Sequence, residues 1–243
     1  MKSPLFLFWQ APQSRRWHAV GKLDREGDKF RFVYTYGAKA ASGFQPFGRM
    51  TDLEKKYESE SMFPIFENRL LSKSRSGYKD FVSWLGLSES EVDPMNILAL
   101  TGGARATDTL LLYPKPVPTE DNRFILHFFL HGIQYMPVAV LGQINKLQPG
   151  ESLFPMFDVL NDHDPYAVTV RTSAPPHMIG YVPRFFARDI RFCMRGIDQS
   201  AHLKVVQVNP EAPTQMRLLC RFEADWPADF SPCDSEEFKP IME

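Results

Sequence analysis

Residues 151–195 read ESLFPMFDVLNDHDPYAVTVRTSAPPHMIGYVPRFFARDIRFCMR, and this stretch organises the second half of the chain. It begins with an apolar run after the turn at Pro149-Gly150, and a polar, aromatic turn at 161–166 stands directly before an alternating segment. Gly180-Tyr181-Val182-Pro183-Arg184 then leads into a segment rich in arginine. This order predicts strand, polar loop, strand, hairpin, strand and helix, with the loop and the helix start facing one groove.

The flanking sequence adds further short strands. Phe124–Phe129 is strongly apolar, and Leu203–Val208 and Leu218–Phe222 are two late strands. We expect Val138–Ile144 to continue as a strand or a wide turn. Many short strands separated by regularly spaced turns favour a barrel.

The N-terminal half has strands first, then helices, then one more strand. In the strand Lys29–Tyr36, the side chains of Phe30, Phe32 and Tyr34 fall on one face, which is typical of a sheet with one buried side. The other expected segments are strands at Leu5–Gln10, Trp17–Asp24 and Thr109–Tyr113, a long loop at Gly37–Met50, a short turn from Thr51 through Tyr57, and helices at Phe63–Leu71, Tyr78–Leu85 and Pro94–Leu100. The predicted fold class is α+β, with a small N-terminal sheet carrying helices and a C-terminal β-barrel with one or two helices.

The proline-rich stretch 114–122 marks a domain boundary, because alternate prolines hold a backbone extended and stiff. We expect an N-terminal domain at 1–113, a linker at 114–122 and a second domain at 123–225. Residues 226–243 are acidic and contain prolines, which predicts a loose acidic tail.

The composition is that of an ordinary globular chain, with 44% hydrophobic residues and a net charge of −1. A net charge near zero neither supports nor excludes a nucleic-acid partner. The three cysteines are too few for a disulfide scaffold and lack metal-ligand spacing, so a reducing cytoplasm is the simplest expectation. The apolar run Leu5–Trp9 is far too short for a signal peptide or a membrane span. We expect no cofactor.

Three motifs follow one another in the second half: Gly132-Ile133-Gln134-Tyr135, then Asn161-Asp162-His163-Asp164, then Gly180-Tyr181-Val182-Pro183-Arg184. With these motifs, the chain from about Phe124 to about Phe222 resembles the HIRAN domain. HIRAN domains are small barrels related to the OB fold that bind single-stranded DNA ends. The resemblance implies an OB-like HIRAN β-barrel and a DNA partner.

The resemblance also implies roles for residues of the polar loop. In HIRAN domains this loop reads Asn-Pro-Tyr-Asp or Asn-Pro-His-Asp, so Asn161, His163 and Asp164 match and Asp162 replaces the proline. The carboxylate of Asp164 would accept a hydrogen bond from a terminal sugar hydroxyl, and the ring of His163 would stack on a base. The added charge of Asp162 would repel phosphate.

The other two motifs carry further implied contacts. Gln134 stands where the family commonly has a phosphate-binding arginine, so the position keeps a donor and loses the charge. Tyr135 keeps a stacking surface. Tyr181 and Arg184 match family positions that contact DNA, and Arg188 continues a basic ridge along the expected helix, at whose start phosphate binds well.

Each motif also has a structural interpretation. The Asn and Asp side chains of 161–164 can form a turn by bonding their own backbone. Asp162, His163 and Asp164 could instead hold a metal ion, for which no distant third ligand is obvious, or act as an acid–base pair. Tyr135 fits a half-buried strand tyrosine equally well. Arg184, Arg188, Arg191 and Arg195 are also typical of a solvated helix face.

Two further motifs have simpler alternatives. Thr101-Gly102-Gly103 lacks the Gly-Lys-Ser/Thr ending of a phosphate loop, which favours a helix stop. The cluster of Arg69, Lys73 and Arg75 would meet DNA or an acidic partner, or else form a solvated helix end.

The N-terminal half carries a second resemblance. The motifs Gly21-Lys22-Leu23, Phe30–Tyr34, Phe63–Leu71 and Gly102-Gly103-Ala104-Arg105 are similar to those of the N-terminal subdomain of HipA-type proteins, over roughly residues 15–113. HipA-type proteins belong to bacterial toxin–antitoxin modules, and their kinase chemistry lies in a separate C-terminal domain. The sequence has no histidine-arginine-aspartate catalytic loop and no lysine-bearing phosphate loop. The resemblance therefore implies a protein-contact module.

Together these features predict a non-catalytic, cytoplasmic bacterial protein that binds single-stranded DNA at a 3′ end. Its N-terminal module would join a toxin–antitoxin or defence complex, with a HipA-family kinase as the implied protein partner. The alternative is an antitoxin-like interaction subunit that holds such a kinase without binding DNA. A nuclease or other hydrolase is a third class, for which the sequence offers no Gly-x-Ser-x-Gly nucleophile elbow.

Overall fold

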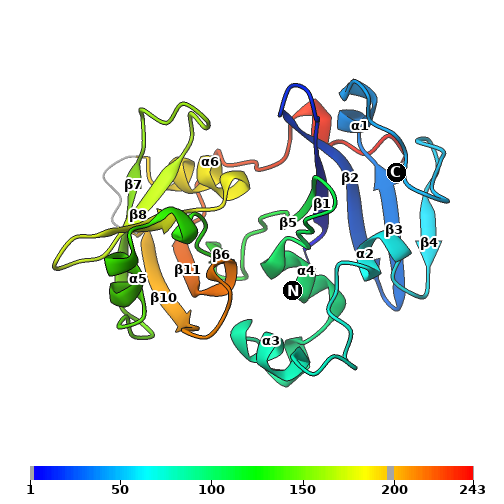
Figure 1. The fold of residues 1–243 in the computed structure, drawn as a ribbon. Helices are drawn as coiled ribbons and strands as arrows, with labels where there is room; N and C mark the ends of the chain where they lie inside the picture. The colour runs from blue at the N-terminus through cyan, green and yellow to red at the C-terminus, as the bar shows by residue number, and fades with distance from the viewer. Residues whose placement is uncertain (1–2, 196–199, 243) are drawn as a thin grey trace. The chain divides into compact units, whose positions relative to one another are not determined.

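The computed structural model of the chain describes residues 3–195 and 200–242, which divide into two compact units (Figure 1). Unit 1 comprises Met1–Tyr78, Ser88–Lys115 and Ser231–Glu243, and unit 2 comprises Lys79–Leu87 and Pro116–Phe230. One junction, between Lys115 and Pro116, lies inside the stretch 114–122 that we expected to be a linker. The sequence did not predict that Lys79–Leu87 belongs to unit 2 or that Ser231–Glu243 belongs to unit 1, because we inferred the domain boundaries from composition alone.

Unit 1 is built on a five-stranded antiparallel sheet with the strand order β4-β3-β2-β1-β5. The strands are β1 (Leu5–Gln10), β2 (Trp17–Glu26), β3 (Lys29–Tyr34), β4 (Tyr57–Ser59) and β5 (Leu110–Pro114). The helices are α1 (Tyr36–Ala40), α2 (Pro64–Glu67) and α4 (Pro94–Thr101), with 3-10 turns at η1 (Glu89–Glu91) and η4 (Glu236–Phe238).

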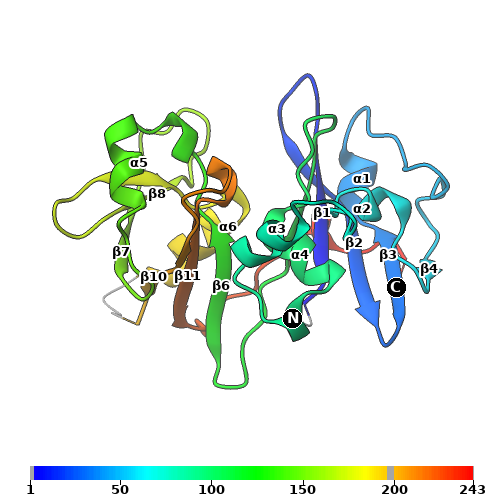
Figure 2. The same ribbon diagram turned by 60° about the horizontal axis from the view of Figure 1, so that its bottom comes forward.

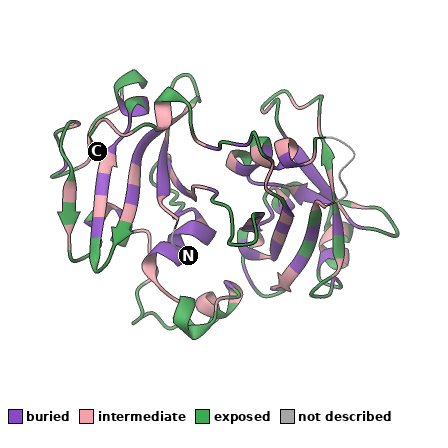
Figure 3. Ribbon diagram, turned by 180° about the vertical axis from the view of Figure 1, so that it is seen from behind, coloured by how far each residue is buried: buried purple, intermediate pink, exposed green. Residues whose placement is uncertain are grey.

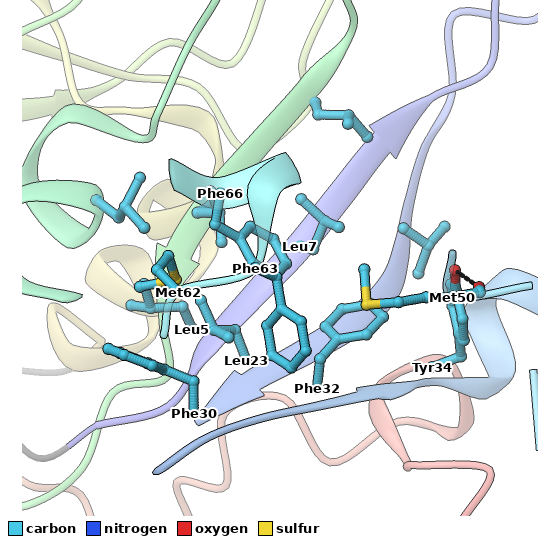
Figure 4. Packing of buried hydrophobic residues seen from close by; sticks show 14 of the residues in the cluster. Leu5, Leu7, Leu23, Phe30, Phe32, Tyr34, Met50, Met62, Phe63 and Phe66 are labelled. Carbon is cyan, nitrogen blue, oxygen red and sulfur yellow. Dashed lines mark hydrogen bonds between the residues drawn. The ribbon is translucent and has the colours of Figure 1, made fainter. Parts of the chain in front are cut away.

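The core of unit 1 lies against one face of this sheet. Phe30, Phe32 and Tyr34 are buried, as the alternation in β3 predicts. Figure 4 shows these rings gathered with Phe63 and Phe66, and the Phe32 and Phe66 ring centroids are 5.5 Å apart. Full burial of one such ring stabilises a fold by about 1.5–3 kcal/mol. The Tyr34 hydroxyl donates to the Met50 carbonyl at 2.6 Å, which satisfies the one polar atom that this ring brings into the core.

Helix α4 forms as the sequence predicts. The Asp93 side chain accepts hydrogen bonds from the backbone N–H groups of Met95 and Asn96, and Pro94 occupies the first helical turn. Gly102 ends the helix in the left-handed conformation, with φ of 66°. The glycine pair is therefore a helix stop, and the carbonyl of Gly103 is used internally by Arg69 at 2.8 Å.

Three expectations for unit 1 were wrong. The stretch Gly37–Met50 is not loop throughout, because α1 packs so closely on β2 that a Cβ on Gly37 would lie 1.9 Å from the Ala19 carbonyl oxygen. The expected turn through Tyr57 instead leads into β4, where Tyr57 pairs with Phe32. Arg69 is not part of a surface cluster, because its side chain is buried and pairs with Asp108 at 2.7 Å.

The C-terminal segment is part of unit 1 and not a loose tail. The ring of Phe238 meets the rings of Phe6 and Phe8 edge-on, at centroid distances of 4.9 and 5.9 Å. The backbone N–H of Ile241 donates to the Tyr34 carbonyl at 2.9 Å, so the segment follows the end of β3. The acidic composition hid these apolar anchors, because the carboxylates lie toward solvent while Phe238 and Ile241 pack inward.

Phe238→Ala should lower the free energy of unfolding by about 1–3 kcal/mol, less than a fully buried phenylalanine because the ring is half-buried. Urea unfolding followed by circular dichroism measures the change. Lys239→Ala is the matched control, since Lys239 is the next residue and is exposed, and surface changes usually stay within about 0.5 kcal/mol. Equal stability of the two variants would show that the segment does not contribute to unit 1.

Unit 2 is a curled six-stranded antiparallel sheet with the order β6-β11-β10-β7-β8-β9. The strands are β6 (Arg123–Phe129), β7 (Ser152–Phe157), β8 (Val168–Arg171), β9 (Met178–Tyr181), β10 (His202–Val208) and β11 (Leu218–Asp225). The helices are α3 (Tyr78–Trp84), α5 (Val138–Ile144) and α6 (Arg184–Cys193), with 3-10 turns at η2 (Ile133–Tyr135) and η3 (Thr214–Met216). Figure 2 shows β6, β11 and β10 side by side, and Figure 3 shows buried residues along the strands of each sheet and exposed residues in the loops.

A two-bond bridge links the two edges of this sheet. The backbone N–H of His131, just after β6, donates to the Tyr181 carbonyl in β9 at 2.8 Å, and Tyr181 N–H returns a bond to the His131 carbonyl at 2.8 Å. Gly180 permits this approach, because a Cβ at that position would lie 2.6 Å from the His131 carbonyl oxygen. The bridge brings η2, which follows His131, against β9.

The segment Val138–Ile144 is a helix, so the expectation of a strand or wide turn was wrong. Val138 is 83% exposed while Ile144 is fully buried, so the short helix buries only one side, although its β-branched residues resemble strand sequence. Helix α5 begins after Pro137, whose fixed φ suits the residue before a helix.

Unit 2 also includes a segment from the N-terminal half. The buried side chain of Asn209 donates to the carbonyls of Trp84 at 2.9 Å and Met216 at 2.8 Å, and Gln207 donates to Ser83 at 2.7 Å. Gly86 lies so near Leu219 that a Cβ there would come within 2.9 Å of its side chain. The end of α3 and the residues after it are therefore fastened to the β10–β11 hairpin.

Candidate nucleic-acid interface

The polar loop between β7 and β8 is folded by its own side chains. Asn161 Oδ1 accepts hydrogen bonds from the backbone N–H groups of His163 at 3.0 Å and Asp164 at 2.9 Å. Asp164 Oδ1 accepts from the Tyr166 N–H at 2.9 Å, and Asn161 Nδ2 donates to Asp158 at 3.0 Å. The turn that asparagine and aspartate form with their own backbone is thus present, and it orders the loop.

Arg184 fastens this loop to the start of α6. Its guanidinium donates to the His163 carbonyl at 2.7 Å, and its Nε lies 3.3 Å from the Asp164 carboxylate. The Asp164 side chain is only 14% exposed, whereas that of Arg184 is 43% exposed. Arg184 therefore holds the loop and keeps further N–H donors open to solvent.

Two further arginines of α6, Arg188 and Arg191, also pack against the loop and the end of β7. Arg188 lies over the ring of Tyr166, 5.7 Å from its centroid. Arg191 donates to the Pro165 carbonyl at 3.0 Å and lies 4.6 Å from the centroid of the Phe157 ring. Contacts between a cation and an exposed ring contribute about 0.5–1 kcal/mol each. These arginines are therefore neither a bare DNA-facing ridge nor a merely solvated helix face.

Tyr181 joins the other side of the loop. Its hydroxyl donates to Asp158 Oδ2 at 3.2 Å, while its backbone makes the bridge to His131. Burial and the neighbouring Asp158 carboxylate raise the pKa of the Tyr181 phenol above its usual value. The phenol therefore remains a neutral donor at physiological pH.

The 3-10 turn η2 presents two of the expected contact residues to solvent. Gly132 adopts the left-handed conformation with φ of 74°, and a Cβ there would approach the Tyr181 ring at 3.2 Å. Gln134 is exposed, and Tyr135 is 80% exposed. Tyr135 is therefore not a half-buried strand tyrosine, and its ring is available for stacking.

The structure brings most of the expected site residues into one connected cluster. Contacts of the loop, β9 and α6 link the set Asn161, His163, Asp164, Tyr181, Arg184 and Arg188. Gln134 and Tyr135 reach it through Gly132, which lies against the Tyr181 ring. His163 itself is an exposed residue of the loop.

Sequence reasoning missed Asp158, which ties both Asn161 and Tyr181 to the end of β7. An aspartate directly after a strand and three residues before an asparagine is a usable signal for such a loop. The ring partners of the arginines were missed as well. Sequence spacing does not reveal which ring a long side chain will cover.

The electrostatic character of the cluster is mixed. Asp158, Asp162 and Asp164 stand against the guanidinium groups of Arg184, Arg188 and Arg191. Such a balance gives little long-range attraction for phosphate, so any anion must be held by local contacts. In residues 3–195 and 200–242, no group of three or more His, Cys, Asp or Glu side chains is placed to hold a metal ion. The helices of the same ranges lack the length and apolar character needed to span a bilayer.

Asp189 lies on the half-buried side of α6. Burial raises the pKa of its carboxyl to about 7, although the charge of Arg188 acts in the opposite direction. Because this pKa is above the ordinary value of 3.8, the folded state holds the Asp189 proton more tightly than the unfolded state does. The resulting contribution to stability is fully present below about pH 4 and is lost as the pH rises through 7.

Asp189→Asn should therefore raise the free energy of unfolding at pH 7.5 by about 1–3 kcal/mol and leave it nearly unchanged at pH 4. Urea unfolding at both pH values measures this. Asp162→Asn is the control, since that residue is exposed in the polar loop. A variant no more stable than wild type at pH 7.5 would contradict the effect of burial on Asp189.

The fold and the cluster define a small antiparallel barrel with a polar loop fixed across one helix start. Residues 124–226 match the family model described as "HIRAN domain", so this part of the chain is a HIRAN domain. The match lies within unit 2 and covers less than half of the chain.

Two solved structures are similar to part of the chain. A protein from Lactobacillus plantarum shares 17% identity, over 42% of this chain and 96% of that one, with a TM-score of 0.32. The HIRAN domain of human HLTF shares 15% identity, over 44% of this chain and 84% of that one, with a TM-score of 0.31. No functional conclusion follows from similarities of this size. No curated protein matches the chain.

Proposed function

We propose that unit 2 binds single-stranded DNA at a 3′ end through the surface formed by η2, the polar loop and the start of α6. HIRAN domains are a family of DNA-binding domains, which supports nucleic-acid binding in general. The observation that carries the finer proposal is the fixed loop, on which His163 stays exposed while η2 presents Tyr135 with 80% of its surface open. A rigid loop beside exposed rings suits an unstacked base, because little ordering is needed on binding.

Each residue has a role that its contacts allow. Tyr135 and His163 stack on bases, and Gln134 donates a hydrogen bond from its exposed amide. Arg184 positions the loop and directs its remaining N–H donors to a phosphate. The carboxylate of Asp164 already accepts from Tyr166 and pairs with Arg184, and its remaining lone pairs accept from the terminal sugar hydroxyl.

The charge balance of the cluster sets the expected strength of binding. For a strand that contacts only this cluster, with at most about three arginines near phosphate, the magnitude of the slope of log K against log salt should not exceed about 2. Affinity should then come mainly from stacking, at about 1–3 kcal/mol per base.

The role of unit 1 remains a prediction. None of the comparisons supports the HipA resemblance, and the toxin–antitoxin link and the HipA-family kinase partner rest on the sequence motifs alone. Unit 1 would act as a protein-contact module, and the whole protein would act without catalysis. The alternative is an interaction subunit that holds such a kinase and does not bind DNA.

Tyr135→Ala should weaken binding of a 5′-labelled single strand with a free 3′ hydroxyl by about 5- to 150-fold, because one base loses its stacking surface. Fluorescence anisotropy of the full chain measures the affinity. Tyr36→Ala is the control, since Tyr36 is also exposed but lies in unit 1. Both variants should keep the wild-type circular dichroism spectrum.

A strand whose 3′ hydroxyl is replaced by a phosphate should bind more weakly than the free end, because the Asp164 carboxylate would face added negative charge. Equal binding of free and blocked ends would remove the 3′ end from the proposal. Absence of binding to any strand at low salt would favour the interaction subunit.

A further inference from the structure

The outer face of β7 carries exposed apolar side chains that the barrel core does not use. Successive residues of a strand point to opposite faces, so Ser152, Phe154 and Met156 share one face while Leu153 is buried on the other. Phe154 and Met156 are both exposed. Exposed apolar side chains mark a binding surface when they are contiguous, whereas scattered ones are common on any protein.

The neighbouring strands extend this face sideways. Phe154 pairs with Arg171 of β8, and Arg171 pairs with Met178 of β9, so these side chains form one row across the sheet. The guanidinium of Arg171 lies 4.6 Å from the centroid of the Phe154 ring. We call Phe154, Arg171 and Met178 the outer row.

The outer row is joined to the proposed DNA site by paired strand positions, of which Thr169 is buried. One register step along the same strands, Met156 pairs with Thr169, and Thr169 pairs with Tyr181. Tyr181 belongs to the cluster described above, through its bond to Asp158. Two residues along a strand span roughly 6.8 Å, which equals about two steps of a stacked single strand at ~3.4 Å per nucleotide.

A lysine lies at the far side of the outer row. Lys204 of β10 pairs with Ser152, which stands two positions before Phe154 on the same face. A diagonal pair of this kind places the two Cβ atoms within about 7–8 Å, which long side chains bridge. Lys204 is exposed and has no ion pair among the residues that the structure describes.

The charge of this sheet face indicates which kind of ligand it suits. The paired positions of this face include two cations and no carboxylate within the described strands. These positions are Lys204, Ser152, Phe154, Met156, Thr169, Arg171, Met178 and Tyr181. The polar loop, in contrast, carries three aspartates. A ring flanked by a guanidinium and an ammonium group suits a chain that alternates flat bases with phosphates.

We propose that the outer row is a second base-stacking subsite, which takes a nucleotide at least two positions from the 3′ end of the strand bound at the polar loop. The base stacks on Phe154 beside Met178, and Arg171 and Lys204 face the adjoining phosphates. This subsite rests on the proposed function of unit 2, and it sets a minimum length of DNA above that of the end contact alone.

The test compares 5′-labelled strands of three and eight nucleotides, with competition anisotropy on the full chain. Wild-type protein should bind the eight-nucleotide strand at least tenfold more tightly than the three-nucleotide strand. Phe154→Ala should remove most of that gain, about 5- to 150-fold, and leave the short strand unchanged. Tyr36→Ala is the matched control, because Tyr36 and Phe154 are both 38% exposed and Tyr36 lies in unit 1.

Charge is tested separately with Arg171→Gln. This variant should lower the salt slope for the eight-nucleotide strand by about 0.7 and leave the slope for the short strand unchanged. Arg25→Gln is its control, since Arg25 also lies over a ring, that of Phe30, at 5.3 Å but in unit 1. Thermal unfolding should show that all four variants remain folded.

The outcomes separate the two proposals. If wild type binds both strands and Phe154→Ala binds the long strand as wild type does, the outer row is not a subsite, although the end contact stands. If wild type binds neither strand, the proposed function fails and the subsite fails with it. If an acidic peptide competes with the long strand and DNA shows no length dependence, the outer row binds protein instead.

Discussion

The candidate interface depends on one short contact between backbones, the pair of hydrogen bonds that joins His131 to Tyr181. This contact links the two edges of the curled sheet, and it sets the turn with Tyr135 against the strand with Tyr181. A side chain at Gly180 would push the two strands apart, so the closure requires glycine there. Without the closure, the residues expected to contact DNA would lie on separate edges of an open sheet.

The arginines of α6 show how one residue serves both stability and recognition. The guanidinium groups of Arg184, Arg188 and Arg191 each contact a ring or a carbonyl of the loop between β7 and β8, so the loop is ordered before any ligand arrives. The cost is that part of their charge is already used, in particular by Asp164. A surface of this kind recognises a ligand more through shape and stacking than through attraction at a distance.

Much of the fold was predictable from residue periodicity, and the site was predictable as a set of residues but not as a set of contacts. The alternation of Phe30, Phe32 and Tyr34 and the cap at Asp93 each depend on neighbours in sequence, and both predictions hold. Helix α5 and the packing of Phe238 depend on distant partners, so local propensity and composition gave the wrong answer. Arg184 was expected to meet phosphate, and its contact with the His163 carbonyl could not be inferred from spacing.

The C-terminal segment, which belongs to unit 1 but follows unit 2 in the sequence, constrains the order in which the chain folds. The sheet of unit 1 gains the packing of Phe238 on Phe6 and Phe8 only when residues 231–243 have been synthesised, after the whole of unit 2. During translation, Phe6 and Phe8 therefore remain without their Phe238 partner while unit 2 is synthesised and folds. A nascent chain of this design has a long interval in which chaperone binding or misassembly competes with folding, and shortening the C-terminal segment would make that interval permanent.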